Sequence, residues 1–367
     1  MTTLPSYLLT YPTVFAVGNE YQIFAPFSDE VIFWVKVGDR TYYDHCNGIL
    51  RSNTNMHRVK LPMAVLDECG EYTVVYRKMI NRAPYFPSSE EERWLTVPFC
   101  PVKSEGAINL YHISDAHNRV AEPIAAGQFF GDDRDLLVLN GDIPDHSGDV
   151  KNFNAICEIA SGITHGEIPV VFARGNHDTR GIHAEDMPNY IPTQDGCTYY
   201  TFRVGALWGL VLDCGEDKAD DHPEYGHTVC FHPFRLEETE FLRRIIANAE
   251  REYDAPGVNY RLVISHIGFT YIDQPPFDIE QDLYREWTKL VAEMHPDLLL
   301  YGHFHRVQIC PQGGDIDHQG QPCTAVIGSR PTPGGFVGCG VTLHPDGSLR
   351  IVFNDEAGNI LTDETEG

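Results

Sequence analysis

The run AINLYHISDAH (residues 107–117) decides the fold, because a strand-like apolar segment ends directly at an aspartate and a histidine. The same arrangement recurs further along the chain, in DLLVLNGD (135–142), PVVFARGNHD (169–178), RLVISH (261–266) and DLLLYGHFH (297–305). Between these runs, segments 235–250 and 279–294 carry apolar residues at three- and four-residue steps, which is typical of amphipathic helices. Strands that alternate with helices predict a layered α/β domain.

Potential metal ligands stand where these strands end, and ligands of α/β sheets gather at the carboxyl ends of strands. The residues are Asp115, His117, Asp142, Asn176, His177, Asp178, His266, His303 and His305. Each motif alone is weak, since a lone histidine such as His266 is more often a core or surface residue. The close pair His303 and His305 is stronger evidence of a metal site, because a bound cation explains neighbouring imidazoles. Carboxylate, amide and imidazole ligands together suit Mn, Fe, Zn or Co, and two such ions can clamp a phosphoryl group.

The N-terminal part of the chain follows a different pattern. Residues 19–99 form short runs rich in β-branched and aromatic residues, separated by turn residues. They predict a small all-β sandwich to which we assign no catalytic or metal-binding role. Tyr72 in it is either a tyrosine corner or an ordinary strand residue. We place the boundary within 101–106, which gives a fibronectin-like sandwich over 1–103 and a catalytic domain over 104–367. At the far end, 336–355 predicts two strands joined by a Pro-Asp-Gly turn.

The composition limits the partners. The chain has 367 residues, 53 acidic against 27 basic, and a formal net charge of −26, which repels nucleic-acid backbones and anionic lipid where no basic run intervenes. We therefore expect a small phosphorylated substrate, no duplex nucleic acid and no membrane. No apolar run reaches the roughly 18 residues of a membrane span, and the N-terminus lacks the features of a signal peptide. Ten cysteines without a C-x-x-C pair favour reduced thiols and a cytoplasmic protein. The oligomeric state stays open.

The blocks ISDAH (113–117), NGD (140–142), RGNHD (174–178), ISH (264–266) and YGHFH (301–305), in this order, resemble the five motifs of the calcineurin-like metallophosphoesterase superfamily. The resemblance implies a layered β-sandwich flanked by helices and two divalent transition-metal ions. By this resemblance, the first ion is held by Asp115, His117 and His305. The second is held by Asn176, His266 and His303, and Asp142 bridges the two. His177 would face the leaving group, oriented by Asp178.

The N-terminal sandwich is similar in arrangement to that of purple acid phosphatases, but two positions depart from that branch. Asp145 stands where those enzymes carry a tyrosine ligand, and they have glycine where His117 stands. We therefore expect no iron–tyrosinate chromophore.

The resemblance implies hydrolysis of a phosphomonoester by a hydroxide that bridges the two ions. We expect Arg180, four residues after Asn176, to bind phosphate oxygens through its fork of donors, and His177 to protonate the leaving group. Two alternatives stay open. One is a phosphodiesterase acting on a cyclic nucleotide or a phospholipid head group. The other is a metal-containing binding protein, which predicts an incomplete site. The filled ligand positions favour an enzyme.

Overall fold

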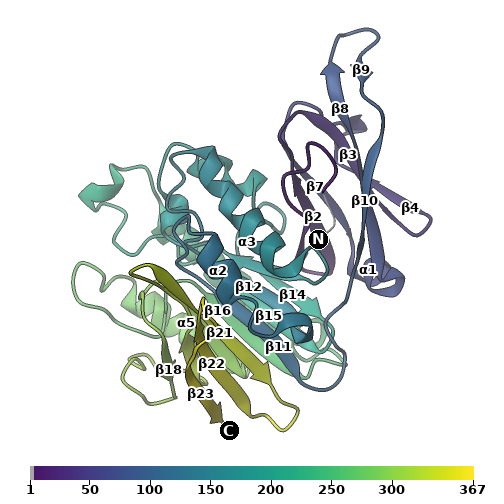
Figure 1. Ribbon diagram of the computed structural model, residues 1–367. Helices are drawn as coiled ribbons and strands as arrows, with labels where there is room; N and C mark the ends of the chain where they lie inside the picture. The colour runs from purple at the N-terminus through teal and green to yellow at the C-terminus, as the bar shows by residue number, and fades with distance from the viewer. Residues whose placement is uncertain (1–3) are drawn as a thin grey trace.

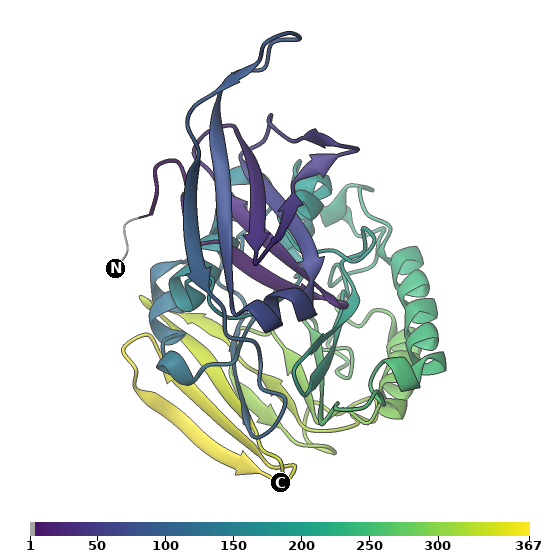
Figure 2. The same ribbon diagram turned by 90° about the vertical axis from the view of Figure 1, so that its right-hand side faces the viewer.

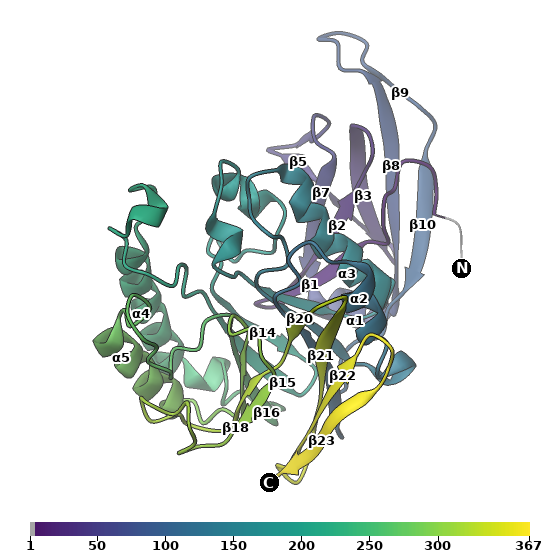
Figure 3. The same cartoon turned by 60° about the vertical axis from the view of Figure 1, so that its left-hand side comes forward.

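Two β-sheets packed face to face form the main body of the molecule, with helices on both outer faces (Figure 1). The computed structural model describes residues 4–367. The layers are helices α2 and α3, a ten-stranded sheet, a six-stranded sheet, and helices α4 and α5, which Figure 3 separates clearly. A five-stranded sheet packs against the N-terminal part of the ten-stranded sheet and completes a small sandwich, which faces the viewer in Figure 2. The predicted α/β architecture with an N-terminal all-β sandwich is confirmed.

The ten-stranded sheet has the order β23-β22-β21-β11-β12-β13-β1-β2-β7, with β20 paired to β21. Its strands are β1 (Thr13–Val17), β2 (Glu20–Pro26), β7 (Met56–Pro62), β11 (Ile108–Ile113), β12 (Leu136–Asn140), β13 (Val170–Ala173), β20 (Arg330–Thr332), β21 (Gly335–Leu343), β22 (Leu349–Asp355) and β23 (Ile360–Glu366). The six-stranded sheet holds β14 (Tyr200–Val204), β15 (Leu207–Leu212), β16 (Tyr260–Ser265), β17 (Leu298–Tyr301), β19 (Ala325–Ile327) and β18 (Gln308–Cys310), in this order.

The remaining strands belong to the N-terminal sandwich. They are β3 (Val31–Val37), β4 (Arg40–Tyr43), β8 (Glu71–Asn81), β9 (Ser88–Ser89) and β10 (Arg93–Pro98), with the small pair β5 (His45–Cys46) and β6 (Ile49–Leu50). The α-helices are α1 (Met63–Cys69), α2 (Ala121–Ala126), α3 (Asn154–Thr164), α4 (Phe231–Ala247) and α5 (Gln281–Glu293). Short 3₁₀ helices are η1 (Gly131–Asp133), η2 (Val150–Phe153), η3 (His177–Thr179), η4 (Ala184–Asn189), η5 (Pro223–Tyr225) and η6 (Ala249–Arg251).

The central strands are parallel and buried on both faces, as expected for a sheet covered on each side. Successive side chains of a strand point to opposite faces. In β12, Leu136 and Val138 therefore pack between the two sheets, whereas Leu137 and Leu139 lie beneath the helices α2 and α3. Burying each such side chain contributes about 1.5–3 kcal/mol, so both faces hold the strand in place. The loops at the strand ends thus start from fixed points.

The N-terminal sandwich is joined to the rest of the molecule through one continuous sheet. Strand β1 pairs in parallel with β13 at Phe15 and Val170, so β1, β2 and β7 extend the sheet that carries β11, β12 and β13. Tyr72 adds a second tie, because its hydroxyl donates to the carbonyl of Gly166, 3.0 Å away, and not to a nearby upstream residue as in a tyrosine corner. The division between residues 103 and 104 stays a prediction, and the sheet itself runs across it.

The predicted helices and terminal strands are present. Helix α5 falls within segment 279–294, and α4 overlaps segment 235–250 but begins four residues before it, at Phe231. Strands β21 and β22 fall on 336–355. Strand β23 was not predicted, because its sequence ILTDETE has no regular alternation of apolar and polar residues. All ten cysteines are free thiols. Within residues 4–367, no helix has both the length and the apolar character needed to cross a membrane.

Candidate metal centre

Five strand ends bring the predicted ligands together at one edge of the two sheets. Strands β11, β12 and β13 contribute from the ten-stranded sheet, and β16 and β17 from the six-stranded sheet. The loops that follow these strands carry Asp115, His117, Asp142, Asn176, His266, His303 and His305. Their side chains form two adjoining groups.

The first group comprises Asp115, His117 and His305, whose ligand atoms lie within 4.8 Å of one another. His305 Nε2 is 3.4 Å from Asp115 Oδ1 and 3.0 Å from His117 Nε2. Asp115 is held in place by the Ser114 hydroxyl, which donates to it at 2.6 Å, and by the backbone N–H of His303 at 3.1 Å. Two imidazole nitrogens aimed at one carboxylate form a ready site for a cation.

The second group comprises Asp142, His266 and His303, again within 4.8 Å of one another. His266 Nε2 lies 3.1 Å from Asp142 Oδ2, and His266 Nδ1 lies 2.7 Å from the carbonyl oxygen of Asn140. The Nδ1–H therefore donates to that carbonyl, which leaves Nε2 directed at the cluster. Asn176 Oδ1 is 3.0 Å from His303 Nδ1, so this amide belongs to the same group.

Asp142 lies between the two groups. It faces His266 on one side, and on the other it forms a further close set with His117 and His177. Gly175 makes room for it, since a β-carbon at that position would lie 2.3 Å from Asp142 Oδ1. This is the place where the resemblance implies a bridging ligand.

The backbone of the ligand loops is strained. Asp115, His117, Asp142, His303 and His305 all adopt φ angles between 47° and 67°, a left-handed region in which a residue other than glycine typically costs about 1–3 kcal/mol. Such strain persists where the surrounding structure fixes it, and it concentrates at functional sites. Here the buried strands before each loop supply that support.

The buried carboxylates of Asp115 and Asp142 are stabilised in their ionised form by neighbouring positive charge. Burial alone would raise the pKa of Asp142, but the charge and hydrogen bond of His266 outweigh it and hold that pKa well below the usual range. Burial likewise opposes protonation of His266, yet the charge of Asp142 raises the pKa of His266 to about 10. Burial also acts against ionisation of Asp115, whose pKa is nevertheless lowered, mainly by its hydrogen bond with His305. Divalent cations satisfy such a cluster better than protons do.

The residues present fit two divalent cations. His266 Nε2, which is directed at the cluster, is buried without a well-aligned hydrogen-bond partner. Two carboxylates, one amide and imidazoles are also the donor set that borderline metals prefer. The prediction therefore stands that Asp115, His117 and His305 would hold one ion, that Asn176, His266 and His303 would hold the other, and that Asp142 would be shared.

His177 lies beside the cluster and is held from two sides. Its ring Nδ1 is 2.8 Å from the carbonyl oxygen of Asp145, and its backbone N–H donates to Asp142 Oδ1 at 2.8 Å. The ring packs edge-on against His117, with ring centroids 4.7 Å apart. Because Nδ1 is bound to a carbonyl, it carries hydrogen, and Nε2 is the nitrogen available for proton transfer.

Asp178 does not orient the ring of His177 as expected. Its buried carboxylate accepts hydrogen bonds from the backbone N–H groups of Gly175 at 2.7 Å and Asp142 at 3.3 Å. Burial, and then the charge of Asp142, raise the pKa of Asp178 well above its ordinary value. The physical reason is the 3₁₀ turn η3, which directs consecutive side chains to different sides. Asp178 therefore fixes the loops that carry Asn176 and Asp142.

Arg180 also departs from the expectation. Its fork donates to Glu216, from Nε to Oε1 at 2.8 Å and from Nη2 to Oε2 at 2.7 Å. Asp217 and Glu224 each lie 3.5 Å from its terminal nitrogens. A guanidinium bound in this way is not free to fork onto a phosphate group. Only Nη1, 3.5 Å from His177 Nε2, is directed towards the site.

An open cleft of about 470 Å³ lies over the cluster. It is lined by Asp142, Asn176, His177, Arg180, Asp217, Tyr271, Asp273, Phe277, His303, Phe304, His305 and Arg306. Sequence reasoning did not single out Asp217, Tyr271, Asp273 or Arg306. They stand on irregular loops without periodicity. Tyr271, Asp273 and Arg306 could be found by their position shortly after His266 or His305, whereas Asp217 follows β15, whose end carries no predicted ligand.

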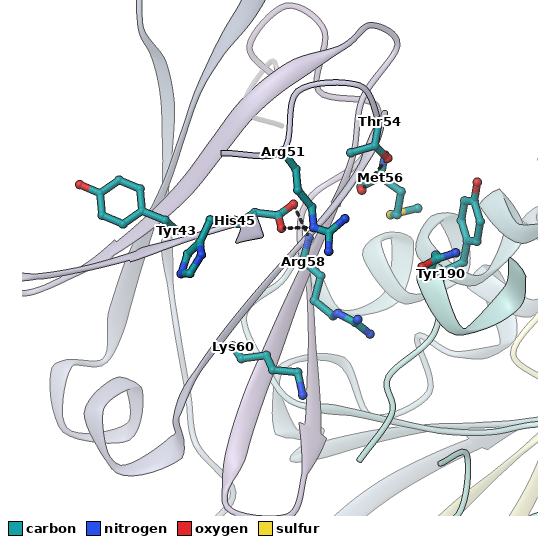
Figure 4. Close-up of a pocket in the computed structure, with 10 residues that line it drawn as sticks. Tyr43, His45, Arg51, Thr54, Met56, Arg58, Lys60 and Tyr190 are labelled. Carbon is teal, nitrogen blue, oxygen red and sulfur yellow. Dashed lines mark hydrogen bonds and ion pairs between the residues drawn. The ribbon is translucent and has the colours of Figure 1, made fainter. Parts of the chain in front are cut away.

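A larger cavity of about 530 Å³ lies elsewhere, between the sandwich and η4 (Figure 4). Its cations are already engaged: Arg51 contacts Asp44 at 3.3 Å and Lys60 contacts Glu20 at 2.9 Å. Arg58 donates to backbone carbonyls in and just after η4. None of the strand-end ligands lines this cavity, so we place the site at the smaller cleft.

Comparison with known proteins agrees with this geometry. Residues 108–307, more than half of the chain, match the calcineurin-like phosphoesterase family. A solved structure of a purple acid phosphatase from yellow lupin (Lupinus luteus) seeds is 13% identical, covers 97% of this chain and 73% of its own, and has a TM-score of 0.60. The structure of PhoD is 10% identical, covers 99% and 94%, and has a TM-score of 0.56. At these identities both show a shared fold. No curated protein matches the chain in sequence.

Proposed function

We propose that this chain, a member of the calcineurin-like phosphoesterase family, removes phosphate from small phosphomonoesters. Membership of the family makes it a metal-dependent phosphoester hydrolase with a dinuclear divalent metal centre. The observation that carries the proposal is the position of His177 at the wall of the cleft, beside the predicted ligands. An alkyl or sugar phosphate needs a proton on its leaving oxygen, and a histidine near neutrality is the side chain best suited to give one.

The residues around the cleft have separate roles in the proposed hydrolysis. When bound, the two ions supply Lewis-acid activation of water and neutralise charge on the phosphate oxygens. His177 holds a proton at Nε2 for the leaving group, since the carbonyl of Asp145 fixes the other ring nitrogen. Arg180 is held by Glu216, so its fork is not free for the phosphate. Asp178 positions the loops beneath.

The charge of the molecule supports a small substrate. With a formal net charge of −26, the surface repels long polyanions. The dianionic phosphate of a monoester carries more charge than that of a diester, and the cleft has the guanidinium group of Arg306 in its lining, beside the predicted metal ligands.

The test is an assay of matched esters with protein loaded with Mn, Zn, Co or Fe, alongside metal analysis. We expect kcat/KM for 4-nitrophenyl phosphate and glycerol phosphate to exceed that for bis(4-nitrophenyl) phosphate and a cyclic nucleotide by at least about tenfold. Faster turnover of the diesters would identify a phosphodiesterase. Full metal occupancy without turnover of any ester would favour a binding protein.

A further inference from the structure

We propose that Arg306 binds a second anionic group of the substrate, a carboxylate or another phosphate, and so selects substrates that carry one. The inference deepens the proposed function and rests on it. Arg306 directly follows the predicted ligand His305 and lines the same cleft as Asp142 and His303. A group bound at Arg306 would therefore belong to the same molecule as a phosphate at the metal cluster.

The guanidinium of Arg306 makes no hydrogen bond or ion pair within residues 4–367. Its Nε is buried and has no hydrogen-bond partner, and within residues 4–367 no carboxylate forms an ion pair with it. The guanidinium carbon lies 5.3 Å from the centre of the Phe304 ring, which supports the planar group from one face. In a chain with 53 acidic against 27 basic residues, an arginine without a carboxylate at a catalytic cleft points to an anion supplied by a ligand.

The neighbouring cations are already engaged. Arg180 donates bidentately to Glu216. Lys218 donates to Asp217 at 2.8 Å. Their positive charge is balanced by residues of the chain itself. Arg306 is thus the guanidinium of the cleft lining whose fork remains available for a carboxylate or a phosphate.

The surroundings of Arg306 suit an organic group that bears the anion. Tyr271 packs edge-on against Phe304 with ring centroids 5.3 Å apart, and Phe277, which is 39% exposed, lines the same cleft. These rings offer an apolar wall to the part of the substrate between its two charged ends. Asp273 also lines the cleft and repels an anion on its own side, which directs the second anion towards Arg306.

The experiment compares 4-carboxyphenyl phosphate with 4-carbamoylphenyl phosphate, which have the same shape and differ in charge. In Arg306→Gln we expect the ratio of the two kcat/KM values, carboxylate over amide, to fall about tenfold to a hundredfold relative to wild type, the typical range for a hydrogen bond to a charged group. Arg306→Lys keeps the charge without the fork and should give an intermediate ratio. Calorimetric titration with 4-carboxybenzylphosphonate and its carbamoyl counterpart measures the same preference as a ratio of Kd values, without turnover.

The control is Arg350→Gln, which removes one positive charge far from the cleft, from the exposed pair of Arg350 with Asp363. It should change neither ratio. Unchanged ratios in Arg306→Gln overturn the proposal, and so does an equal fall in Arg350→Gln, which would assign the effect to overall charge. The proposed function fails separately, if monoesters are not hydrolysed while the Kd ratio still depends on Arg306.

Discussion

The N-terminal sandwich and the loops of Asp115 and Asp142 are joined by one ten-stranded sheet, yet their buried carboxylates have different surroundings. In the sandwich, buried Asp44 is closed off by partners of its own chain: His57 Nδ1 lies 2.7 Å from it and Arg51 Nε lies 3.3 Å from it. In the ligand loops, Asp115 and Asp142 face imidazoles on a backbone with positive φ angles. One region balances its own charges, whereas the other is arranged to receive divalent cations.

The largest effect should come from the same substitution made in each region. Asp142→Asn should lose both ions and reduce kcat/KM by more than about a hundredfold, the loss that outer-shell partners alone can produce, because a neutral amide bridges two cations poorly. The amide oxygen can still accept the His177 backbone N–H, so the loop should keep its shape. Metal analysis and the 4-nitrophenyl phosphate assay measure both effects.

Asp44→Asn is the matched control in the sandwich. It removes the charged partner of buried His57 and should lower the melting temperature, while metal content and activity stay at wild-type values. If Asp142→Asn retained its metals, or if both variants lost them equally, the contrast between the two regions would be refuted.

The next effect separates chemistry from metal binding at the ligand loops. His177→Asn should keep both ions, because His177 is not a predicted ligand, and its amide can still donate to the carbonyl of Asp145. The rate on glycerol phosphate should fall about a hundredfold to ten-thousandfold, the usual range for general acid catalysis. The rate on 4-nitrophenyl phosphate should fall far less, since nitrophenolate departs almost unaided. Equal losses on both esters at full metal occupancy would reject the acid role.

The ligand set could be predicted from the sequence because its signal is local. Each ligand follows an apolar strand directly, as in the step from β12 to Asp142, and parallel strands in one layer must end at a common edge. Nothing local predicts the partner of a long side chain. Arg180 meets Glu216, 36 positions away on an irregular loop, and the fork predicted for phosphate is occupied for that reason.

Local sequence patterns could not predict how the two regions are joined either. A hairpin leaves a turn in the sequence, but the parallel pairing of β1 with β13 connects Phe15 to Val170 without one. The same holds for Asp178, whose place in η3 decides that it binds the backbone of Gly175 and Asp142. Type and order of strands follow from patterns, whereas pairing over long separations follows from packing.

Two buried histidines sharpen the comparison through pH. His57 of the sandwich is paired with Asp44, whereas His112 of β11 is buried with neither ring nitrogen hydrogen-bonded, and burial lowers the pKa of His112 to about 3. Between that value and the unfolded pKa of about 6.5, the unfolded chain binds more protons, so stability falls as the pH falls through this window.

The acid limb is the fall of the free energy of unfolding as the pH decreases. In His112→Leu, a substitution of similar volume, this fall should be smaller by about 1.4 kcal/mol for each pH unit inside the window. Urea denaturation of chelator-treated protein at several pH values measures it, because metal binding is itself pH-dependent. His45→Leu, at an exposed position of the sandwich, should leave the limb unchanged. An unaltered limb in His112→Leu would show that His112 does not remain neutral in the folded chain.

The smallest effect tests whether the two regions unfold together. The Tyr72 hydroxyl ties the sandwich to Gly166 at 3.0 Å, whereas the Tyr76 hydroxyl makes a bond within the N-terminal region, to the carbonyl of Ser6 at 2.6 Å. Tyr72→Phe and Tyr76→Phe each remove one such bond, which typically contributes about 0.5–1.5 kcal/mol. Since β1 and β13 make one sheet of both regions, we expect a single calorimetric transition that both variants lower by a similar small amount, with activity retained. Two transitions, with Tyr76→Phe moving only one of them, would instead show that the predicted division at 103 and 104 separates independent folding units, and that the shared sheet does not couple them.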